Sequence, residues 1–255
     1  MEFFESQGAQ IAFVDLAPTG EDRDEPIVLI HGFASNYSVN WGSTLWTQTL
    51  TRDGRRVIAL DNRGHGQSQK FYDPASYSLR VMAGDVLALM DHLRIARADV
   101  MGYSMGARIA SFLAADHPGH LRSAIFGGLG MRLLMSDPNY LAIVEAMEAP
   151  SLEVLTDPLQ RTFRAFAEQT RSDLGALAAC MRGTRELLTR EEAATIRVPV
   201  LVAAGTKDDL ARDYRELAGV IPGAELLEIP NRDHNLAVGD KVFKRGVLDF
   251  LSRRP

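Results

Sequence analysis

Short apolar runs that end in glycine loops recur along most of the chain. Residues 27–30 (Ile-Val-Leu-Ile) and 57–60 (Val-Ile-Ala-Leu) are continuous apolar runs, which is typical of strands buried on both faces of a sheet. The first run ends at His31-Gly32 and the second at the turn-rich residues 61–66. Both runs are therefore predicted to be strands. Further strands are expected at residues 10–16, around residue 100, and at residues 124–126, 198–203 and 226–229.

Between these runs, apolar residues fall at helical spacing. From residue 78 to residue 93, Met82, Val86 and Leu89 recur at intervals of three and four, and Ser78 is suited to cap the N-terminus. A second helix is predicted from residue 105 to residue 116, because Pro118 stops it. Two more helices are expected, near residues 212–220 and 242–251.

Strands that alternate with helices indicate an α/β fold with a parallel sheet and right-handed crossovers. The alternation breaks at residues 129–196, where the pattern predicts several short helices and no strand. We expect this stretch to be a helical lid inserted into a core made of residues 1–128 and 197–255. Since ligands of open parallel sheets bind at the carboxyl ends of the strands, the lid is expected to cover that site.

Composition and charge narrow the classes of function. The 255 residues are 46% hydrophobic and 24% charged, and 28 Lys and Arg against 33 Asp and Glu give a net charge of -5. No basic run is longer than a pair, so neither nucleic acid nor an anionic membrane surface is an expected partner. No segment approaches the length of a membrane span, and the first residues are acidic where a signal peptide is basic. We expect a cytoplasmic protein.

Metal ions and cofactors are not expected. The single cysteine, Cys180, excludes an intramolecular disulfide and a multi-cysteine metal centre. His117 and His120 lack a third ligand, and the proline between them breaks the helix that would align them. The loop at residues 61–68 is not a phosphate-binding Walker loop, because it lacks G-K-S/T. We interpret it as a turn stabilised by contact between an aspartate and an arginine, Asp61 and Arg63.

The strongest chemical signal is the sequence Gly-Tyr-Ser-Met-Gly at residues 102–106. It matches G-x-S-x-G and lies between a predicted strand and a predicted helix, as that motif requires. A sharp strand-to-helix turn strains the serine, and the glycines let neighbouring backbone pass close by. Ser104 is therefore the candidate nucleophile.

A serine hydroxyl is a weak nucleophile at neutral pH, so it needs a base, and the base needs an orienting acid. Of the six histidines, His234 alone lies downstream of Ser104 in a predicted loop after a strand. The chain order serine, acid, histidine narrows the search for the acid, and two carboxylates, Asp208 and Asp209, come directly after the strand predicted at residues 198–203. We favour Asp208 and expect Asp209 to cap the next helix. Asp233, the neighbour of His234, is expected at the surface.

Acyl transfer also needs hydrogen-bond donors for the developing oxyanion. The turn at His31-Gly32-Phe33 can aim the backbone N–H of Phe33 at the site. The N–H of Met105, at the start of a predicted helix, would join it, because the dipole of the helix favours negative charge there. His31 itself is expected to hold this loop through bonds to backbone.

These motifs, in this order, resemble the α/β-hydrolase superfamily over almost the whole chain. The resemblance implies an eight-stranded, mostly parallel sheet with helices on both faces and a lid at residues 129–196. It also implies the nucleophile Ser104, the acid Asp208, the base His234, and an oxyanion hole from Phe33 and Met105. The residues that carry it are H-G-F at 31–33, D-x-R-G-x-G-x-S at 61–68, G-Y-S-M-G at 102–106, G-x-x-D at 205–208, and D-H at 233–234.

The substrate is less constrained. Serine at position 104 argues against the haloalkane dehalogenases and epoxide hydrolases of the family, which use aspartate there. The loop at residues 31–34, H-G-F-A, is neither the H-G-G-G of some lipases nor the H-G-x-G-P typical of C–C bond hydrolases. We expect a carboxylesterase (EC 3.1.1) that acts on a small-molecule ester of small or medium acyl length.

Three alternatives stay open. The first is C–C, thioester or lactone hydrolysis, or acyl transfer, by the same triad. The second is a small-molecule receptor without turnover, and the complete triad argues against it. The third is an interaction protein, which would require a large exposed apolar face on residues 129–196.

Overall fold

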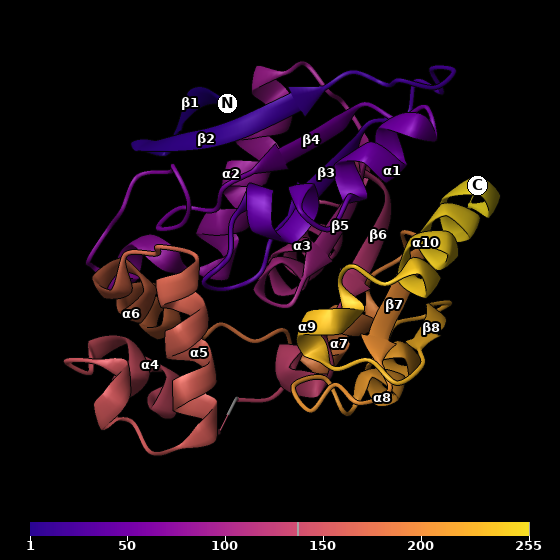
Figure 1. The fold of residues 1–255 in the computed structure, drawn as a ribbon. Helices are drawn as coiled ribbons and strands as arrows, with labels where there is room; N and C mark the ends of the chain where they lie inside the picture. The colour runs from indigo at the N-terminus through magenta and orange to yellow at the C-terminus, as the bar shows by residue number, and fades with distance from the viewer. Residues whose placement is uncertain (137, 255) are drawn as a thin grey trace.

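A single eight-stranded sheet runs through the computed structural model of the protein (Figure 1). The structure describes residues 1–136 and 138–254; residues 137 and 255, which fall in the predicted lid and the predicted core, lie outside the described residues. The strands are β1 (Glu2–Ser6), β2 (Ala9–Leu16), β3 (Ile27–Ile30), β4 (Val57–Leu60), β5 (Ala98–Tyr103), β6 (Leu121–Gly127), β7 (Val200–Gly205) and β8 (Glu225–Ile229).

The strand order is β1-β2-β4-β3-β5-β6-β7-β8. The β1–β2 and β2–β4 pairs are antiparallel, and every pair from β4 to β8 is parallel. This confirms the predicted α/β class with a mostly parallel sheet. It also places the carboxyl ends of β3, β5, β7 and β8 along one edge, where the loops that carry the candidate chemistry begin.

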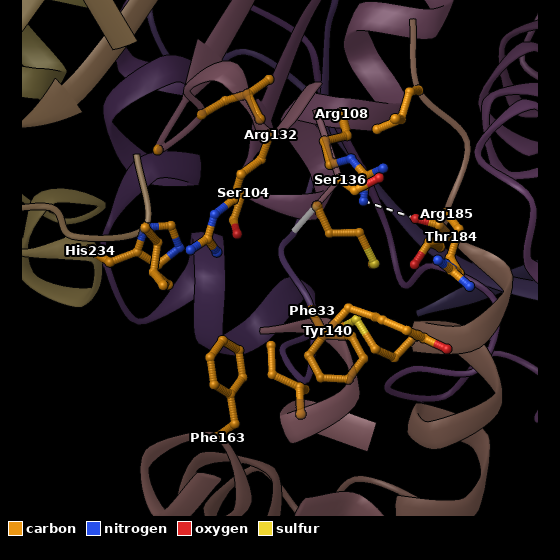
Figure 2. A pocket seen from close by; sticks show the side chains of 17 residues that line it. Phe33, Ser104, Arg108, Arg132, Ser136, Tyr140, Phe163, Thr184, Arg185 and His234 are labelled. Atoms are coloured by element: carbon orange, nitrogen blue, oxygen red, sulfur yellow. Dashed lines mark hydrogen bonds between the residues drawn. The ribbon is translucent and has the colours of Figure 1, made fainter. Parts of the chain in front are cut away.

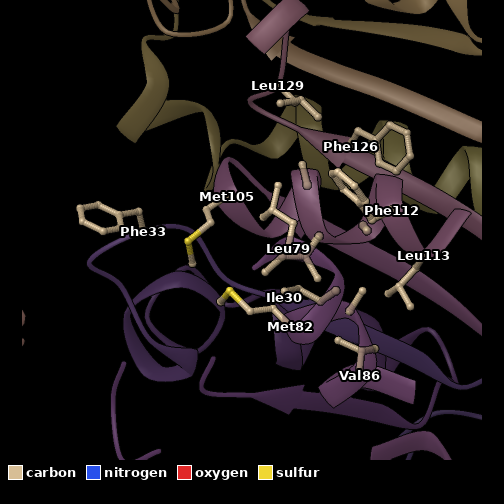
Figure 3. Close-up of a cluster of buried hydrophobic side chains, with 14 of the residues drawn as sticks. Ile30, Phe33, Leu79, Met82, Val86, Met105, Phe112, Leu113, Phe126 and Leu129 are labelled. Carbon is tan, nitrogen blue, oxygen red and sulfur yellow. The ribbon is translucent and has the colours of Figure 1, made fainter. Parts of the chain in front are cut away.

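The continuous apolar runs are explained by two core layers, one on each face of the sheet. Val28 and Ile30 of β3 join one cluster of buried side chains, whereas Ile27 and Leu29 join the other. Successive side chains of a strand point to opposite faces, so a strand covered on both sides must be apolar at every position. Figure 3 shows part of the first cluster, in which Ile30 lies near side chains of two helices that cover this face.

Helices cover both faces of the sheet. α2 and α3, with α8, contribute buried side chains to the first cluster, and α1 and α10 contribute to the second. As predicted, Ser78 caps α2, because its hydroxyl accepts the N–H of Val81. Among the residues the structure describes, no helix has both the length and the apolar character needed to cross a membrane. The bounds are α1 (Trp46–Arg52), α2 (Leu79–His92), α3 (Met105–Asp116), α8 (Tyr214–Val220), α9 (His234–Ala237) and α10 (Lys241–Arg253), with the short π-helix η1 (Ser38–Gly42) and the 3₁₀-helices η2 (Pro74–Tyr77) and η3 (Pro118–His120).

The chain between β6 and β7 is helical, as the pattern predicts, and we call residues 131–194 the helical segment. In Figure 1, α4, α5 and α6 form a group of their own beside the sheet, where α4 packs against both of the others. The segment consists of η4 (Met131–Leu133), α4 (Tyr140–Glu148), η5 (Leu152–Val154), α5 (Pro158–Gln169), α6 (Leu174–Gly183) and α7 (Arg190–Ala194).

Some elements differ from the prediction. The pattern predicts neither β1 nor α1, because β1 is a short edge strand with mixed exposure and α1 is too short to show a helical period. β7 begins at Val200, two residues later than predicted. His234, predicted in a loop, is the first residue of the one-turn helix α9.

The predicted contact between Asp61 and Arg63 is wrong. Arg63 instead forms a bidentate ion pair with Asp85 of α2, with distances of 2.7 Å from Nε to Oδ2 and 2.6 Å from Nη2 to Oδ1. The carboxylate of Asp61 accepts the backbone N–H groups of Tyr37 and Gln67. Arg63 pairs with a helix that is distant in the sequence, so the residues of its own loop do not predict this partner.

Candidate active site

Ser104 occupies a strained turn between β5 and α3. Its backbone angles are φ 54° and ψ -114°, a conformation that costs roughly 1–3 kcal/mol for a residue other than glycine. The flanking glycines allow the turn to pack: a Cβ on Gly102 would lie 2.1 Å from the carbonyl oxygen of Gly106, and one on Gly106 would lie 2.0 Å from that of Ile30. The turn therefore requires small residues on both sides of the serine, as the motif predicts.

His234 and Asp208 lie in contact. Asp208 follows β7 and His234 follows the neighbouring strand β8. Nδ1 of His234 is 2.8 Å from Oδ2 of Asp208, whose side chain is fully buried. The other oxygen, Oδ1, accepts the backbone N–H groups of Leu210 at 3.0 Å and Ala211 at 3.1 Å. Because an ionised carboxylate only accepts, we assign the proton of the neutral imidazole to Nδ1, which leaves Nε2 as an acceptor.

The neighbouring acids are placed differently. Asp209 is 79% exposed and bonds Arg212, so the prediction that it caps the next helix is wrong. Asp208 itself holds that turn through the two backbone bonds just described, and α8 begins only at Tyr214. Asp233 is exposed, as expected, and its carboxylate caps α9 by accepting two backbone N–H groups. This cap explains why His234 begins a helix.

Tyr103, which directly precedes Ser104, links the strained turn to His234. Its hydroxyl donates to the backbone carbonyl of His234 at 2.7 Å, and the two rings are 5.3 Å apart between centroids. Burial of the phenol, followed by the nearby carboxylates of Asp208 and Asp233, raises the pKa of Tyr103 well above its ordinary value. The hydroxyl therefore stays protonated and remains a donor.

Four of the five predicted site residues line one pocket: Ser104, His234, Phe33 and Met105 (Figure 2). Asp208 lies behind His234, bonded to its Nδ1. Met105 is the first residue of α3, so its N–H belongs to the first turn, where backbone donors have no acceptor within the helix. The role of Phe33 and Met105 as oxyanion donors stays a prediction.

His31 holds the loop after β3, as expected. It is fully buried; its Nε2 accepts the N–H of Asn62 at 2.9 Å, and its Nδ1 donates to the carbonyl of Gly32 at 2.8 Å. Burial lowers the pKa of His31 to about 4. His65 is also fully buried, and its pKa falls to about 3 from burial, followed by the proximity of His31. Both rings are neutral near pH 7.

Much of the pocket wall could not be predicted from the sequence. Only Arg108 had a local signal, because it lies four residues after Ser104 and so faces the same side of α3. Thr184, Arg185 and the residues of η4 and α4 come from the helical segment, where no motif marks them. Within the described residues, no group of three His, Cys, Asp or Glu is placed to hold a metal ion. The residues missed are Arg108, Gly128, Leu129, Arg132, Ser136, Tyr140, Ile143, Phe163, Thr184, Arg185, Leu187 and Leu210.

Comparison with known proteins gives a family and several distant relatives. A family model for the alpha/beta hydrolase fold matches residues 25–177, more than half of the chain. A dihydrolipoyllysine-residue acetyltransferase component of an acetoin cleaving system from Pseudomonas putida is 28% identical over 232 residues, which are 84% of this chain and 60% of that protein. Epoxide hydrolase B of Mycobacterium tuberculosis is 30% identical over 129 residues, which are 48% of this chain and 35% of that protein.

The chain thus spans less than two thirds of the length of either of these relatives. Among solved structures, a hydrolase from Pseudomonas aeruginosa PA01 is similar with a TM-score of 0.79 and 25% sequence identity. That similarity covers 98% of this chain and 97% of the other. The names of these relatives cover several chemistries, so the choice of reaction has to come from the pocket.

Proposed function

The chain belongs to the alpha/beta hydrolase fold family, and from that premise we propose that it is a serine hydrolase (EC 3.1.1) for carboxylic esters of small or medium acyl length. One observation carries the proposal: the strained Ser104 lines the same pocket as His234, whose Nδ1 bonds the buried carboxylate of Asp208. A nucleophile, a base and an orienting acid in this arrangement support acyl transfer.

In the first half of the reaction, Oγ of Ser104 forms a bond to the ester carbonyl carbon as its proton moves to Nε2 of His234. The carboxylate of Asp208 stabilises the resulting imidazolium through the 2.8 Å bond to Nδ1. The backbone N–H groups of Phe33 and Met105 donate to the oxyanion.

Collapse of the tetrahedral intermediate then breaks the bond between the carbonyl carbon and the alcohol oxygen. His234 gives its proton to that oxygen, the alcohol leaves, and an acyl group remains on Ser104. Water attacks this acyl-enzyme while His234 takes a proton from it, and the carboxylic acid is released with Ser104 restored.

We also propose that residues 129–196 act as a lid on a core made of residues 1–128 and 197–255. Each of α4, α5 and α6 contributes a side chain to the pocket, and Figure 2 shows Tyr140 and Phe163 in its wall. The hydroxyl of Thr170, at the end of α5, donates to the carbonyl of Ala34 in the loop after β3 at 2.8 Å. A lid held in this way would exclude water from the acyl-enzyme until the alcohol has left.

The test is hydrolysis of p-nitrophenyl esters from acetate to decanoate by the wild type and by Ser104→Ala. Loss of the nucleophile is expected to lower kcat roughly 10⁶-fold. Ser252→Ala, on the outer helix α10, is the matched control and should keep the wild-type rate. Turnover that survives in Ser104→Ala contradicts the mechanism. A folded wild type that cleaves none of the esters would favour lactone or C–C bond hydrolysis, or a receptor.

A further inference from the structure

The turn that follows β3 contains a strained residue next to Phe33. Ala34 has φ 55° and is fully buried. The N–H of Ser35 bonds the carbonyl of Gly32 at 3.3 Å and so closes a four-residue turn, and a positive φ at the third residue is what a type II turn requires. Glycine or asparagine normally occupies that position, because other side chains are strained there. Contacts from outside the turn must therefore stabilise it.

The shape of this turn sets the direction of the Phe33 N–H. A trans peptide is planar, so this N–H points away from the carbonyl of Gly32. That carbonyl is held by Nδ1 of His31 at 2.8 Å and by the bond from Ser35 that closes the turn. Within residues 1–136 and 138–254, no atom accepts the N–H of Phe33. The N–H is therefore available to an oxyanion, and its direction depends on the turn keeping its shape.

A hydroxyl of the helical segment stabilises the turn. Oγ1 of Thr170, at the end of α5, donates to the carbonyl of Ala34 at 2.8 Å. Its single proton has two other carbonyls within 3.0 Å, those of Phe166 and Ala167, but each of them already accepts a backbone N–H. The carbonyl of Ala34 has no backbone donor in the described part of the chain. We therefore assign the proton to Ala34, because a buried carbonyl without a donor is costly.

The backbone around Thr170 is rigid. α5 ends in a Schellman motif, in which the N–H groups of Ser172 and Arg171 bond carbonyls of the last turn at 2.9 and 3.0 Å. Oγ of Ser172 lies 2.9 Å from Oγ1 of Thr170 and 3.5 Å from the carbonyl of Ala34. With the Thr170 proton directed to Ala34, Ser172 donates to Thr170, and a chain of hydrogen bonds of this kind strengthens each member.

Other contacts keep α5 in place when the hydroxyl of Thr170 is removed. The ring of Phe163 on α5 lies 6.2 Å from the ring of Phe33 between centroids, and both rings line the pocket (Figure 2). Beyond the end of α5, the carboxylate of Asp173 accepts the hydroxyl of Tyr72 at 2.8 Å. Loss of the Thr170 hydroxyl should therefore release the turn without displacing the helical segment.

We propose that Thr170 is a positioning residue of the oxyanion hole, whose hydroxyl holds the strained turn at Ala34 so that the N–H of Phe33 points at the developing oxyanion. The inference rests on the proposed serine hydrolase function and adds a residue to it. Thr170 is not among the described residues that line the pocket, so it acts through the backbone of residues 32–35. Because the oxyanion forms only during the reaction, the hydroxyl should affect kcat and leave substrate binding unchanged.

The test removes the hydroxyl and keeps the shape of the side chain. Complete loss of one oxyanion donor lowers kcat about 100- to 1000-fold. A donor that is only less well oriented should cost less, so Thr170→Val should lower kcat for p-nitrophenyl butyrate about tenfold and change KM less than about twofold. Thr170→Ser restores a hydroxyl and should keep at least about half of the wild-type kcat.

Thr162→Val is the matched control. Thr162 lies on the same helix and is exposed, and its hydroxyl donates to the carbonyl of Pro158 within the helix at 2.8 Å. The substitution is chemically the same as Thr170→Val and should keep the wild-type kcat and KM. Thermal unfolding of all variants shows that each is folded.

A second readout reports on the oxyanion itself. An alkyl trifluoromethyl ketone accepts a bond from Oγ of Ser104 to its carbonyl carbon while the serine proton moves to His234, and the oxygen becomes an oxyanion. Such a mimic of the transition state should bind less tightly to Thr170→Val by the same factor by which kcat/KM falls. Binding of butyrate, the product, should be unchanged.

The outcomes separate the two proposals. Equal kcat values for Thr170→Val and Thr162→Val would overturn the positioning role and leave the serine hydrolase intact. A loss in KM alone would assign Thr170 to substrate binding, and equal losses in Thr170→Val and Thr170→Ser would mean that the hydroxyl has no role. A fall in kcat without weaker binding of the ketone would reject the link to the oxyanion. Failure of the folded wild type to cleave any ester rejects both proposals.

Discussion

The two sides of the pocket are held in different ways. On the side of the sheet, Asp208 and His31 are buried and each is fixed by bonds to backbone or to a neighbouring ring. On the side of the helical segment, Arg185 is exposed and rests on the ring of Tyr140, which belongs to the same segment. Under the proposed function, the strand ends would hold the reacting groups and the helical segment would set the choice of substrate.

The sharpest test of this division concerns two adjacent aspartates. Asp208→Asn should lower kcat roughly 10⁴-fold, because the amide disturbs the tautomer and charge of His234, whereas Asp209→Asn should change it less than about twofold. Ester hydrolysis at pH 7.5 measures both. Equal losses, or a larger loss in Asp209→Asn, would contradict the assignment of the acid.

A second test compares two ion pairs. Arg63 and Asp85 are both nearly fully buried on the side of the sheet, so Arg63→Met leaves an uncompensated buried carboxylate and should lower the free energy of unfolding by about 3–5 kcal/mol. Arg190 and Glu216 are both more than half exposed, and Arg190→Gln should cost less than about 1 kcal/mol. Urea unfolding measures both values. Similar losses would mean that the two ion pairs contribute equally to the free energy of unfolding.

The third test uses the buried rings of His31 and His65. Their pKa values in the folded protein, about 4 and about 3, lie below the ordinary value of 6.5, so the unfolded chain binds protons first as the pH falls. Their stabilisation is complete above about pH 6.5 and is lost as the pH drops toward those values. Between pH 7.5 and pH 5 each ring should remove about 2 kcal/mol from the free energy of unfolding.

Urea unfolding of the wild type and of histidine variants across this pH range measures the slope of the free energy of unfolding against pH. The variants show which histidines cause that slope. His117→Gln removes an exposed histidine and should leave the slope unchanged, whereas His31→Asn should remove one ring's share. A wild-type free energy of unfolding that is flat from pH 7.5 to pH 5 would contradict the buried neutral rings.

The smallest effect is expected in the helical segment. Thr189 and Glu192 form a capping box at the start of α7, with backbone-to-side-chain bonds of 3.0 and 2.7 Å. Thr189→Ala should lower the free energy of unfolding by about 1 kcal/mol and leave the rate of ester hydrolysis unchanged. Thermal unfolding and the ester assay measure both quantities, and a loss above about 3 kcal/mol would show that this segment stabilises the whole fold.

The sequence predicts the side of the pocket formed by the sheet much better than the other side. Buried strands and the strained turn at Ser104 follow local rules, because both depend on a few adjacent residues. The contact between His234 and Asp208 joins positions 26 apart, yet chain order and the strand-end rule were enough to suggest it. The predicted partner of Arg63 was wrong, because no residue in its own loop indicates Asp85 on α2.

The contribution of the helical segment to the pocket could not be predicted from the sequence. Its helices are predictable from spacing, but which side chains enter the pocket depends on how short helices pack against one another. Arg108 is an exception, since its position on α3 is fixed by the turn at Ser104. Arg132 and Arg185 come from stretches with no motif, so their convergence on the pocket is a property of tertiary packing.

The bond from Tyr103 to the carbonyl of His234 has a consequence for biosynthesis. It connects positions 131 apart, and Tyr103 directly precedes the proposed nucleophile. While the chain is still emerging from the ribosome, the serine is made long before its base and acid, so the nascent protein carries an inert hydroxyl. Under the proposed function, Ser104 could meet its base and acid only once residues 200–234 have been translated and have docked onto the sheet.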